Sequence, residues 1–303
     1  MSQSITNTLE TLLAPRLADT ALAFWQKSRD ELTAGVSTHR FAALIALASR
    51  HAKRTPLELS PEEIDAIAEL GVSIDMRGWN LLELLRVGLI TARCDLNEVS
   101  FAEDFEAQFV YADEGETCAL YRALALLPAG ERFVWRAGEG CRTNMNNVFA
   151  TIALDTPYPV QHFDDTAWNQ LVMKSLFLEL PLWRVLGLDN RRSQDLTRMV
   201  LDFAEERESA GRAINNGLWL CLGPHDNERT SALALRAWAA ANSGQHAAIV
   251  LGLARCNLVA VAEQLGADSI DTSVTSALQA AQNGQTDNIH FAQLTADNSE
   301  TQA

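Results

Sequence analysis

The chain has little lysine, no long apolar run and no stretch typical of a secretion signal. Three lysines stand against 21 arginines among 303 residues. The longest apolar runs, such as FAALIALA at 41–48, fall far short of the ~20 residues that span a bilayer. The N-terminal MSQSITNTLETLLAPRLAD lacks the basic start and apolar block of a signal peptide. We therefore expect a cytoplasmic protein that does not span the membrane.

Paired cysteines are also missing, although five single ones are present. They are scattered along the chain and form no CxxC pair, so their spacing predicts neither a zinc site nor a redox motif. Several stand among apolar residues, where a free thiol behaves as a small core side chain. We expect reduced, structural cysteines at Cys94, Cys118, Cys141, Cys221 and Cys256.

Positive charge is in short supply overall, with a formal net charge of −15. Such a chain repels phosphate, which argues against nucleic acid or an anionic membrane as a partner. The acid is concentrated between Cys94 and Tyr121, where eight carboxylates occur without one lysine or arginine. This segment is either a solvated surface or a docking surface for a basic partner.

Helical periodicity dominates what is there, and strand alternation is nearly absent. We predict an all-α fold of about a dozen antiparallel helices stacked as an irregular array, with no substantial sheet and no repeat at a fixed period. Residues 1–283 are predicted to form a single domain, and 284–303 a polar, flexible tail. The expected helices cover 4–32 (interrupted or kinked at Pro15), 38–53, 60–70, 79–92, 100–111, 114–127, 131–154, 164–178, 193–209, 218–222, 228–241, 246–264 and 269–281.

The most irregular stretch, LDTPYPVQH at 154–162, leads into the predicted helix DDTAWNQLVMKSLF at 164–177. Asp164 and Asp165 are suited to cap that helix and to interact with its dipole, so neither needs a functional role. Asn169, Gln170 and Lys174 lie in a helix that is apolar on nearly every side. If they are buried, each requires a partner, whether an ion pair, a core hydrogen bond or a ligand.

These residues resemble a known family. NNVFATIALDTPYPVQHFDDTAWNQLVMKSLFLELPLWRVLGLD, LTRMVLDFAEERESAGR and NNGLWLCLG, within 140–225, are similar to the EboA family of bacterial ebo gene clusters. The resemblance implies an all-helical protein in the traffic of secondary-metabolite precursors, working beside other ebo-cluster proteins as a scaffold or carrier. It implies no catalytic residues. The matching features are Tyr158–Pro159, Phe163–Asp164, Trp168–Asn169–Gln170 with Lys174, and Arg207 with Gly211–Arg212.

We therefore predict a non-catalytic scaffold or small-metabolite binding protein, with a small aromatic or isoprenoid metabolite as the ligand and without a cofactor or a metal. Aromatic side chains beside amides and a lysine are a mixture typical of ligand pockets. The candidate ligand-binding residues are Tyr158, His162, Asp164, Trp168, Asn169, Gln170, Lys174, Arg207 and Arg212.

An enzyme is the main alternative, because FDD in a helical chain of this length invites comparison with terpenoid synthases. DDTAWNQ lacks a later acid, however, and DNRRSQDLT ends in Thr197 where a carboxylate is needed. A metal site drawn from His162, Asp164 and the pair His225–Asp226 is a further possibility, although these residues also suit caps and turns. Hydrolase, P-loop and dinucleotide motifs are absent. A pure interaction module using the acidic segment is the third hypothesis.

Overall fold

The computed structural model describes residues 2–267 and 269–295, and in this part of the chain the fold is all-α. Eighteen α-helices and four short 3₁₀ helices (η1–η4) are joined by turns, and the described residues contain one isolated bridge, Pro56–Asn80, in place of a sheet. The all-α prediction is confirmed. The chain forms two compact units: unit 1 ends at Asp164 and unit 2 begins at Asp165.

Unit 1 contains ten α-helices and three 3₁₀ helices. In chain order they are α1 Ser2–Leu13, α2 Asp19–Ala34, α3 Thr38–Leu47, η1 Ala48–Arg50, α4 Pro61–Ala68, α5 Leu81–Thr91, α6 Val99–Gln108, α7 Glu114–Ala123, η2 Leu124–Leu126, η3 Gly130–Phe133, α8 Val134–Cys141, α9 Asn146–Ala153 and α10 Tyr158–His162.

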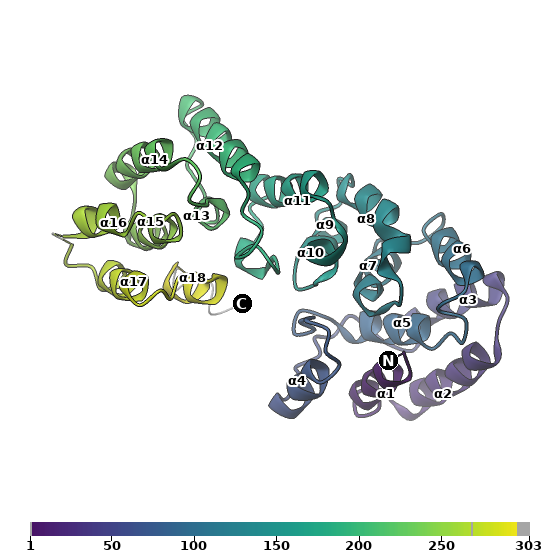
Figure 1. Cartoon of the computed structure of the whole chain (residues 1–303). Helices are drawn as coiled ribbons and strands as arrows, with labels where there is room; N and C mark the ends of the chain where they lie inside the picture. Colours follow the sequence, from purple (N-terminus) through teal and green to yellow (C-terminus); the bar gives the residue numbers. More distant parts are fainter. Residues whose placement is uncertain (1, 268, 296–303) are drawn as a thin grey trace. The chain divides into compact units, whose positions relative to one another are not determined.

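The central helix of unit 1 is α5, which has apolar residues on nearly all sides and packs against α1, α2, α3 and α7 (Figure 1). Asn80 and Glu83 form a reciprocal capping box that satisfies the free N–H groups at its start. Ten of its eleven residues are buried. A helix that is apolar all round belongs in an interior, as here. Even Arg86 is buried, and it donates to the Ile45 carbonyl (3.3 Å) and to Glu116 (3.2 Å).

Local signals in unit 1 act as the sequence predicts. Ser60 and Glu63 form the expected capping box at the start of α4, with Pro61 at its first position. Gly71 follows this helix with φ +70°, a left-handed conformation that favours glycine. Pro15 lies between α1 and α2 and separates them, because proline has no N–H to continue a helix.

The two largest differences between the predicted elements of unit 1 and the structure lie at 131–154 and 155–162. The single helix expected over 131–154 is divided into η3, α8 and α9, and the Thr143 hydroxyl accepts a hydrogen bond from the Met145 N–H at the division. Such local side-chain bonding competes with helix continuation. The expected loop 155–162 contains a short helix, α10, with Pro159 in its first turn, where the missing N–H carries no cost.

Unit 2 contains eight α-helices and one 3₁₀ helix. They are α11 Asp165–Phe177, η4 Leu182–Arg184, α12 Gln194–Ser209, α13 Leu218–Cys221, α14 Asn227–Ala240, α15 Ser243–Arg255, α16 Val259–Gly266, α17 Thr272–Gln282 and α18 Asn288–Thr295.

Helix α15 is the centre of unit 2 and contacts α13, α14, α16, α17 and α18 (Figure 1). Residues 247–253 of this helix are all buried. At Gly252 a Cβ atom would lie only 2.6 Å from Cβ of Trp219, so the glycine permits α13 to approach α15 closely. Trp219 is therefore held against the centre of the unit.

The predicted polar tail begins before α18, in which Phe291 is buried. Residues 296–303 of that tail lie outside the described residues. Within 2–267 and 269–295, no helix has both the length and the apolar content needed to cross a membrane.

Candidate functional site

In unit 1, the candidate Tyr158 has a structural partner. Its hydroxyl donates to the Gly130 carbonyl at 2.7 Å, and its side chain is almost fully buried. The His162 ring lies against it, with ring centroids 4.6 Å apart, and also packs on Gly130, where a Cβ would lie 2.6 Å from Nε2. Burial raises the pKa of Tyr158 above its usual value. These contacts connect α10 to η3. The Tyr158 hydroxyl already donates its proton to the Gly130 carbonyl and so has none left for a ligand.

In unit 2, the candidate Trp168 likewise has a structural partner, Arg191. Its indole N–H donates to the Arg191 carbonyl at 3.0 Å, and the Arg191 guanidinium lies over its ring at 4.9 Å. Arg191 also pairs with Asp165 at 2.7 Å. Trp168 therefore connects α11 to the loop before α12, and a buried tryptophan N–H normally finds a partner of this kind.

The remaining candidates on α11 differ in exposure. Asn169 is buried, and its Oδ1 atom has no hydrogen-bond donor in the described part of the chain. Gln170 is exposed and Lys174 is half-buried. Asp164 is exposed and directly precedes α11, the position that its predicted capping role requires. The ligand-binding role of these residues stays a prediction.

Arg207 closes the loop that follows α12. Its Nε donates to the Ala213 carbonyl at 2.7 Å, and its guanidinium lies 3.6 Å from Glu179 and over the Phe203 ring. Gly211 has φ +66°, which lets the chain reverse at this point. The result is a fixed turn that presents Arg212, which is exposed.

Arg212 lines a pocket of about 170 Å³ inside unit 2. The walls come from the end of α12, the loop after it, α13, α14 and the first turns of α15. Apolar atoms are provided by Trp219, the isoleucines and a run of alanines, and polar atoms by two arginines, a glutamate and two amides. The lining residues are Glu208, Arg212, Ala213, Ile214, Asn216, Trp219, Arg236, Ala237, Ala240, Ala241, Gln245 and Ile249.

The two arginines of this pocket differ in their partners. Arg236 is held by Glu208, whose Oε2 lies 3.0 Å from its terminal nitrogen and 3.2 Å from its Nε. The side chain of Arg212 has no hydrogen-bond or ion-pair partner among the described residues. The pocket thus contains one neutralised guanidinium and one that is available to a ligand.

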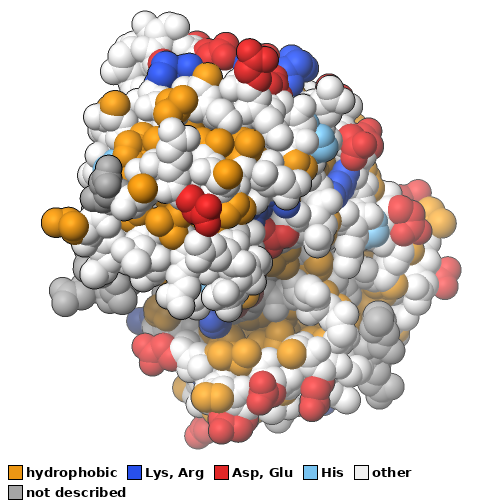
Figure 2. Space-filling model, turned by 60° about the vertical axis from the view of Figure 1, so that its left-hand side comes forward, with side chains coloured by type: hydrophobic (Ala, Val, Ile, Leu, Met, Phe, Trp, Pro, Cys, Tyr) orange, Lys and Arg blue, Asp and Glu red, His pale blue; other side chains and the backbone are white. Residues whose placement is uncertain are grey.

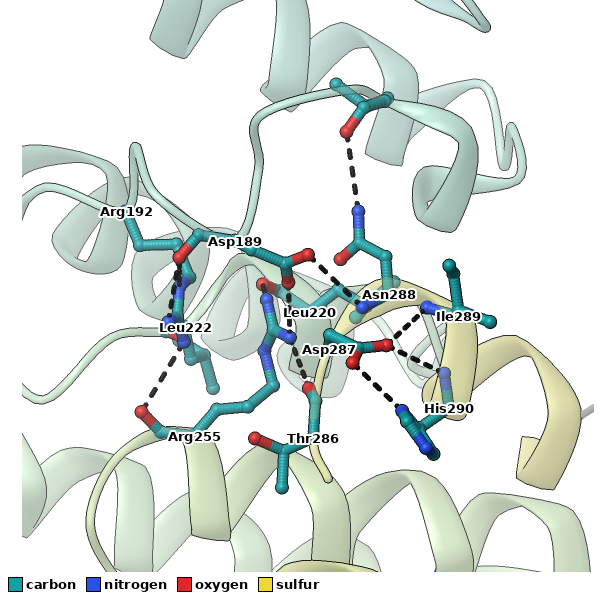
Figure 3. Close-up of polar contacts among 11 residues, drawn as sticks. Asp189, Arg192, Leu220, Leu222, Arg255, Thr286, Asp287, Asn288, Ile289 and His290 are labelled. Carbon is teal, nitrogen blue, oxygen red and sulfur yellow. Dashed lines mark hydrogen bonds and ion pairs between the residues drawn. The ribbon is translucent and has the colours of Figure 1, made fainter. Parts of the chain in front are cut away.

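A buried polar cluster lies elsewhere in unit 2, around Arg255 at the end of α15 (Figure 3). Its guanidinium donates to Asp189 Oδ1 at 2.7 Å, to the Thr286 carbonyl at 2.5 Å and to the Leu220 carbonyl at 3.1 Å. Arg192 donates to the carbonyls of Asp189 and Leu222. Burial, and then the charge of Arg255, lower the pKa of Arg192. The cluster joins the loop before α12 to α13, α15 and the start of α18.

The chain matches the model of a known protein family. The family model described as metabolite traffic protein EboA matches residues 5–223, well over half of the chain. The chain belongs to the EboA family. No curated protein and no solved structure matches it. The family resemblance predicted from residues 140–225 is confirmed, and the match extends from residue 5 through the rest of unit 1.

In this EboA-family chain, the residues of the hypothetical metal site have other contacts. His225 Nε2 lies 2.8 Å from the Arg192 carbonyl, and Asp226 caps α14 by accepting from the Arg229 N–H at 3.1 Å. No group of three or more histidine, cysteine or acidic residues that could hold a metal ion occurs among the described residues. Cys221 and Cys256 are buried, and burial raises the pKa of each thiol to about 12. Neither thiol has the character of a nucleophile.

The acidic segment of this EboA-family chain is largely paired with the chain's own groups. Arg93 binds Asp95 and Asp104, and Arg136 binds Glu106. Six of the eight carboxylates accept a hydrogen bond from an arginine, from the Asn147 amide or from a backbone N–H at a helix start; they are Asp95, Asp104, Glu106, Asp113, Glu114 and Glu116. Only four of the eight face an arginine, so the segment keeps an excess of negative charge, and its docking of a basic partner stays a prediction.

Apolar side chains also gather on the surface of unit 2 (Figure 2). On the side of α14–α17 that is turned to the viewer, several apolar patches lie among other side chains, with an acidic side chain between them and further charged side chains along the edge. Leu235 of α14 is 56% exposed, and Ile270, before α17, is 100% exposed. Exposed apolar area is typical of protein contact surfaces. This side of the EboA-family chain therefore suits contact with a protein partner.

Proposed function

We propose that this EboA-family chain binds a small aromatic or isoprenoid metabolite without transforming it, and holds it in the pocket between α12, α13, α14 and α15. The observation that carries the proposal is the composition of that pocket, which has an apolar floor with a few polar groups around it. This is the usual design of small-molecule sites. The family description as a metabolite traffic protein supports the same role.

The size of the pocket limits the ligand. A cavity of about 150 Å³ lined by apolar side chains is known to accept benzene, and this pocket measures about 170 Å³. It therefore suits one aromatic ring or one five-carbon isoprene unit. Trp219 and Ile249 are almost fully buried, so the walls that would contact such a group are fixed by the packing of unit 2.

The chemistry of the lining favours binding over catalysis. The described lining residues include no cysteine, histidine or serine that could act as a nucleophile or proton carrier. The single carboxylate, Glu208, is engaged by Arg236. A general base needs a free lone pair near the reacting atom, and this carboxylate is better suited to holding Arg236 in place.

The test is ligand-observed NMR with indole and 3-methylbut-2-en-1-ol, using the full chain and two matched variants. Ala237→Leu fills the pocket from α14, whereas Ala239→Leu adds the same atoms to an exposed position of the same helix outside the lining. We expect binding to the parent and to Ala239→Leu, and at least a tenfold loss in Ala237→Leu.

Two outcomes would overturn the proposal. Binding that is equal in both variants would mean that the ligand occupies another place. No binding of either compound to the parent would favour the other role of a traffic protein, a scaffold for the remaining ebo-cluster proteins.

A further inference from the structure

We infer that the pocket of unit 2 selects a ligand with one carboxylate on a ring-sized apolar body, and that Arg212 recognises the carboxylate. The inference rests on the proposed function, since it assigns the chemistry of the ligand in the same pocket. It goes further because it names the charge of the ligand and the residue that binds the charged group.

The charge of the lining is the first argument. Two arginines and one glutamate leave the pocket with one net positive charge, in a chain whose formal net charge is −15. Glu208 already neutralises Arg236. Arg212 is the lining cation without a partner in the described chain, and a guanidinium presents N–H groups in a planar fork that matches a carboxylate.

The neighbouring polar groups are donors as well. Gln245 uses its Oε1 to accept from the Asn242 N–H (2.9 Å), so its amide NH₂ is left for other acceptors. Asn216 contributes a second side-chain amide to the lining. Gln245 lies in the first turn of α15, where the helix dipole favours a negative group. One guanidinium and two side-chain amides therefore belong to the lining of the same small volume.

The carboxylate of Glu208 limits the number of negative charges that the ligand carries. A doubly charged group such as a phosphate monoester would place two negative charges beside this carboxylate, with Arg212 alone to offset them. A carboxylate carries one charge and satisfies the one available guanidinium. The apolar floor of Trp219, Ile214 and Ile249 then accepts the ring or isoprene unit that bears it.

The experiment compares benzoate, benzamide and acetate by ligand-observed NMR at low ionic strength. Benzamide has nearly the same shape as benzoate without the charge, and acetate has the charge without the ring. We expect benzoate to bind about tenfold more tightly than benzamide, a moderate charge-assisted gain because Arg212 is exposed to solvent. We expect acetate to bind at least tenfold more weakly than benzoate, and salt to weaken benzoate alone.

Two variants assign the effect to Arg212. Arg212→Ala should bring benzoate down to the affinity of benzamide and leave benzamide unchanged. Arg198→Ala is the matched control, because it removes the same charge from the exposed side of α12, where Arg198 pairs with Asp202. It should keep the benzoate preference.

The outcomes separate this inference from the proposed function. Equal binding of benzoate and benzamide, both lost in Ala237→Leu, would refute the carboxylate inference and leave the pocket as a ligand site. If Arg212→Ala still prefers benzoate to benzamide, another group binds the carboxylate and the assignment to Arg212 is refuted. Failure of both ring compounds to bind the parent would refute the pocket itself, and the inference with it.

Discussion

Replacing Arg255 by methionine tests whether the buried cluster of Figure 3 holds unit 2 together. The side chain is 2% exposed and its guanidinium donates to Asp189, to the Thr286 carbonyl and to the Leu220 carbonyl. Methionine has a similar unbranched stem, so it fills most of the space and removes the charge and the donors. The acceptors that remain come from three different segments of the unit.

The size of the effect follows from these contacts. Hydrogen bonds to a charged group contribute about 1.5–3 kcal/mol each, and removing one partner of a buried ion pair costs about 3–5 kcal/mol. Two features reduce the loss: the variant no longer buries a guanidinium, and Asp189 is 34% exposed, so its carboxylate regains water. We expect the free energy of unfolding of unit 2 to fall by about 3 kcal/mol, the lower end of that range.

The assay is thermal and urea unfolding, combined with amide hydrogen exchange read by peptide. For a unit of this size, 3 kcal/mol corresponds to a decrease in Tm of about 10 °C. Exchange should accelerate in α13, α15 and α18 and stay unchanged in α5 of unit 1. Arg198→Met is the control, because its exposed pair with Asp202 contributes less than about 1 kcal/mol.

An Arg255→Met variant with the same Tm and urea midpoint as the parent would refute this reasoning, since the cluster would then make no net contribution to the stability of unit 2. Faster exchange spread evenly over both units would also contradict it, because the loss is assigned to contacts within unit 2.

Two further predictions concern titratable groups. The hydrogen bond from Arg93 lowers the pKa of Asp95, so its contribution to stability is complete above about pH 4 and is lost as the pH falls through the lowered value. Acid titration of unfolding should therefore show a shallower loss below pH 4 in Asp95→Asn, whereas Glu103→Gln, at an exposed site, should follow the parent. Native labelling with iodoacetamide, read by intact mass, should modify Cys94, which is exposed. It should spare Cys118, Cys221 and Cys256, because these thiols are buried and burial raises their pKa values to about 11 or 12. Labelling of any of these three before unfolding would contradict their described burial.

The elements that could be predicted from the sequence are those fixed by neighbouring residues. The capping box of Ser60 and Glu63 spans four residues and depends on little else, and the break at Pro15 follows from one missing N–H. The division of the predicted helix 131–154 was missed, because apolar periodicity continues across Thr143 and the competing hydrogen bond to Met145 leaves no strong mark in the sequence.

The contacts of the candidate site could not be predicted, because they join distant residues. The hydroxyl of Tyr158 reaches the carbonyl of Gly130, and the indole of Trp168 reaches that of Arg191. Backbone carbonyls occur at every position, so the sequence does not indicate which one a side chain meets. Arg212 was among the candidates, but Arg236 of its pocket was missed, since only folding brings α14 beside the end of α12.

The position of α15 has a practical consequence for truncated versions of this chain. The family match ends at residue 223, whereas the helix around which unit 2 packs begins at Ser243. A fragment cut at that boundary would leave Leu218, Trp219 and Leu220 without the surface that buries them. Such a fragment is expected to aggregate or to be degraded, and expression trials should retain the C-terminal helices.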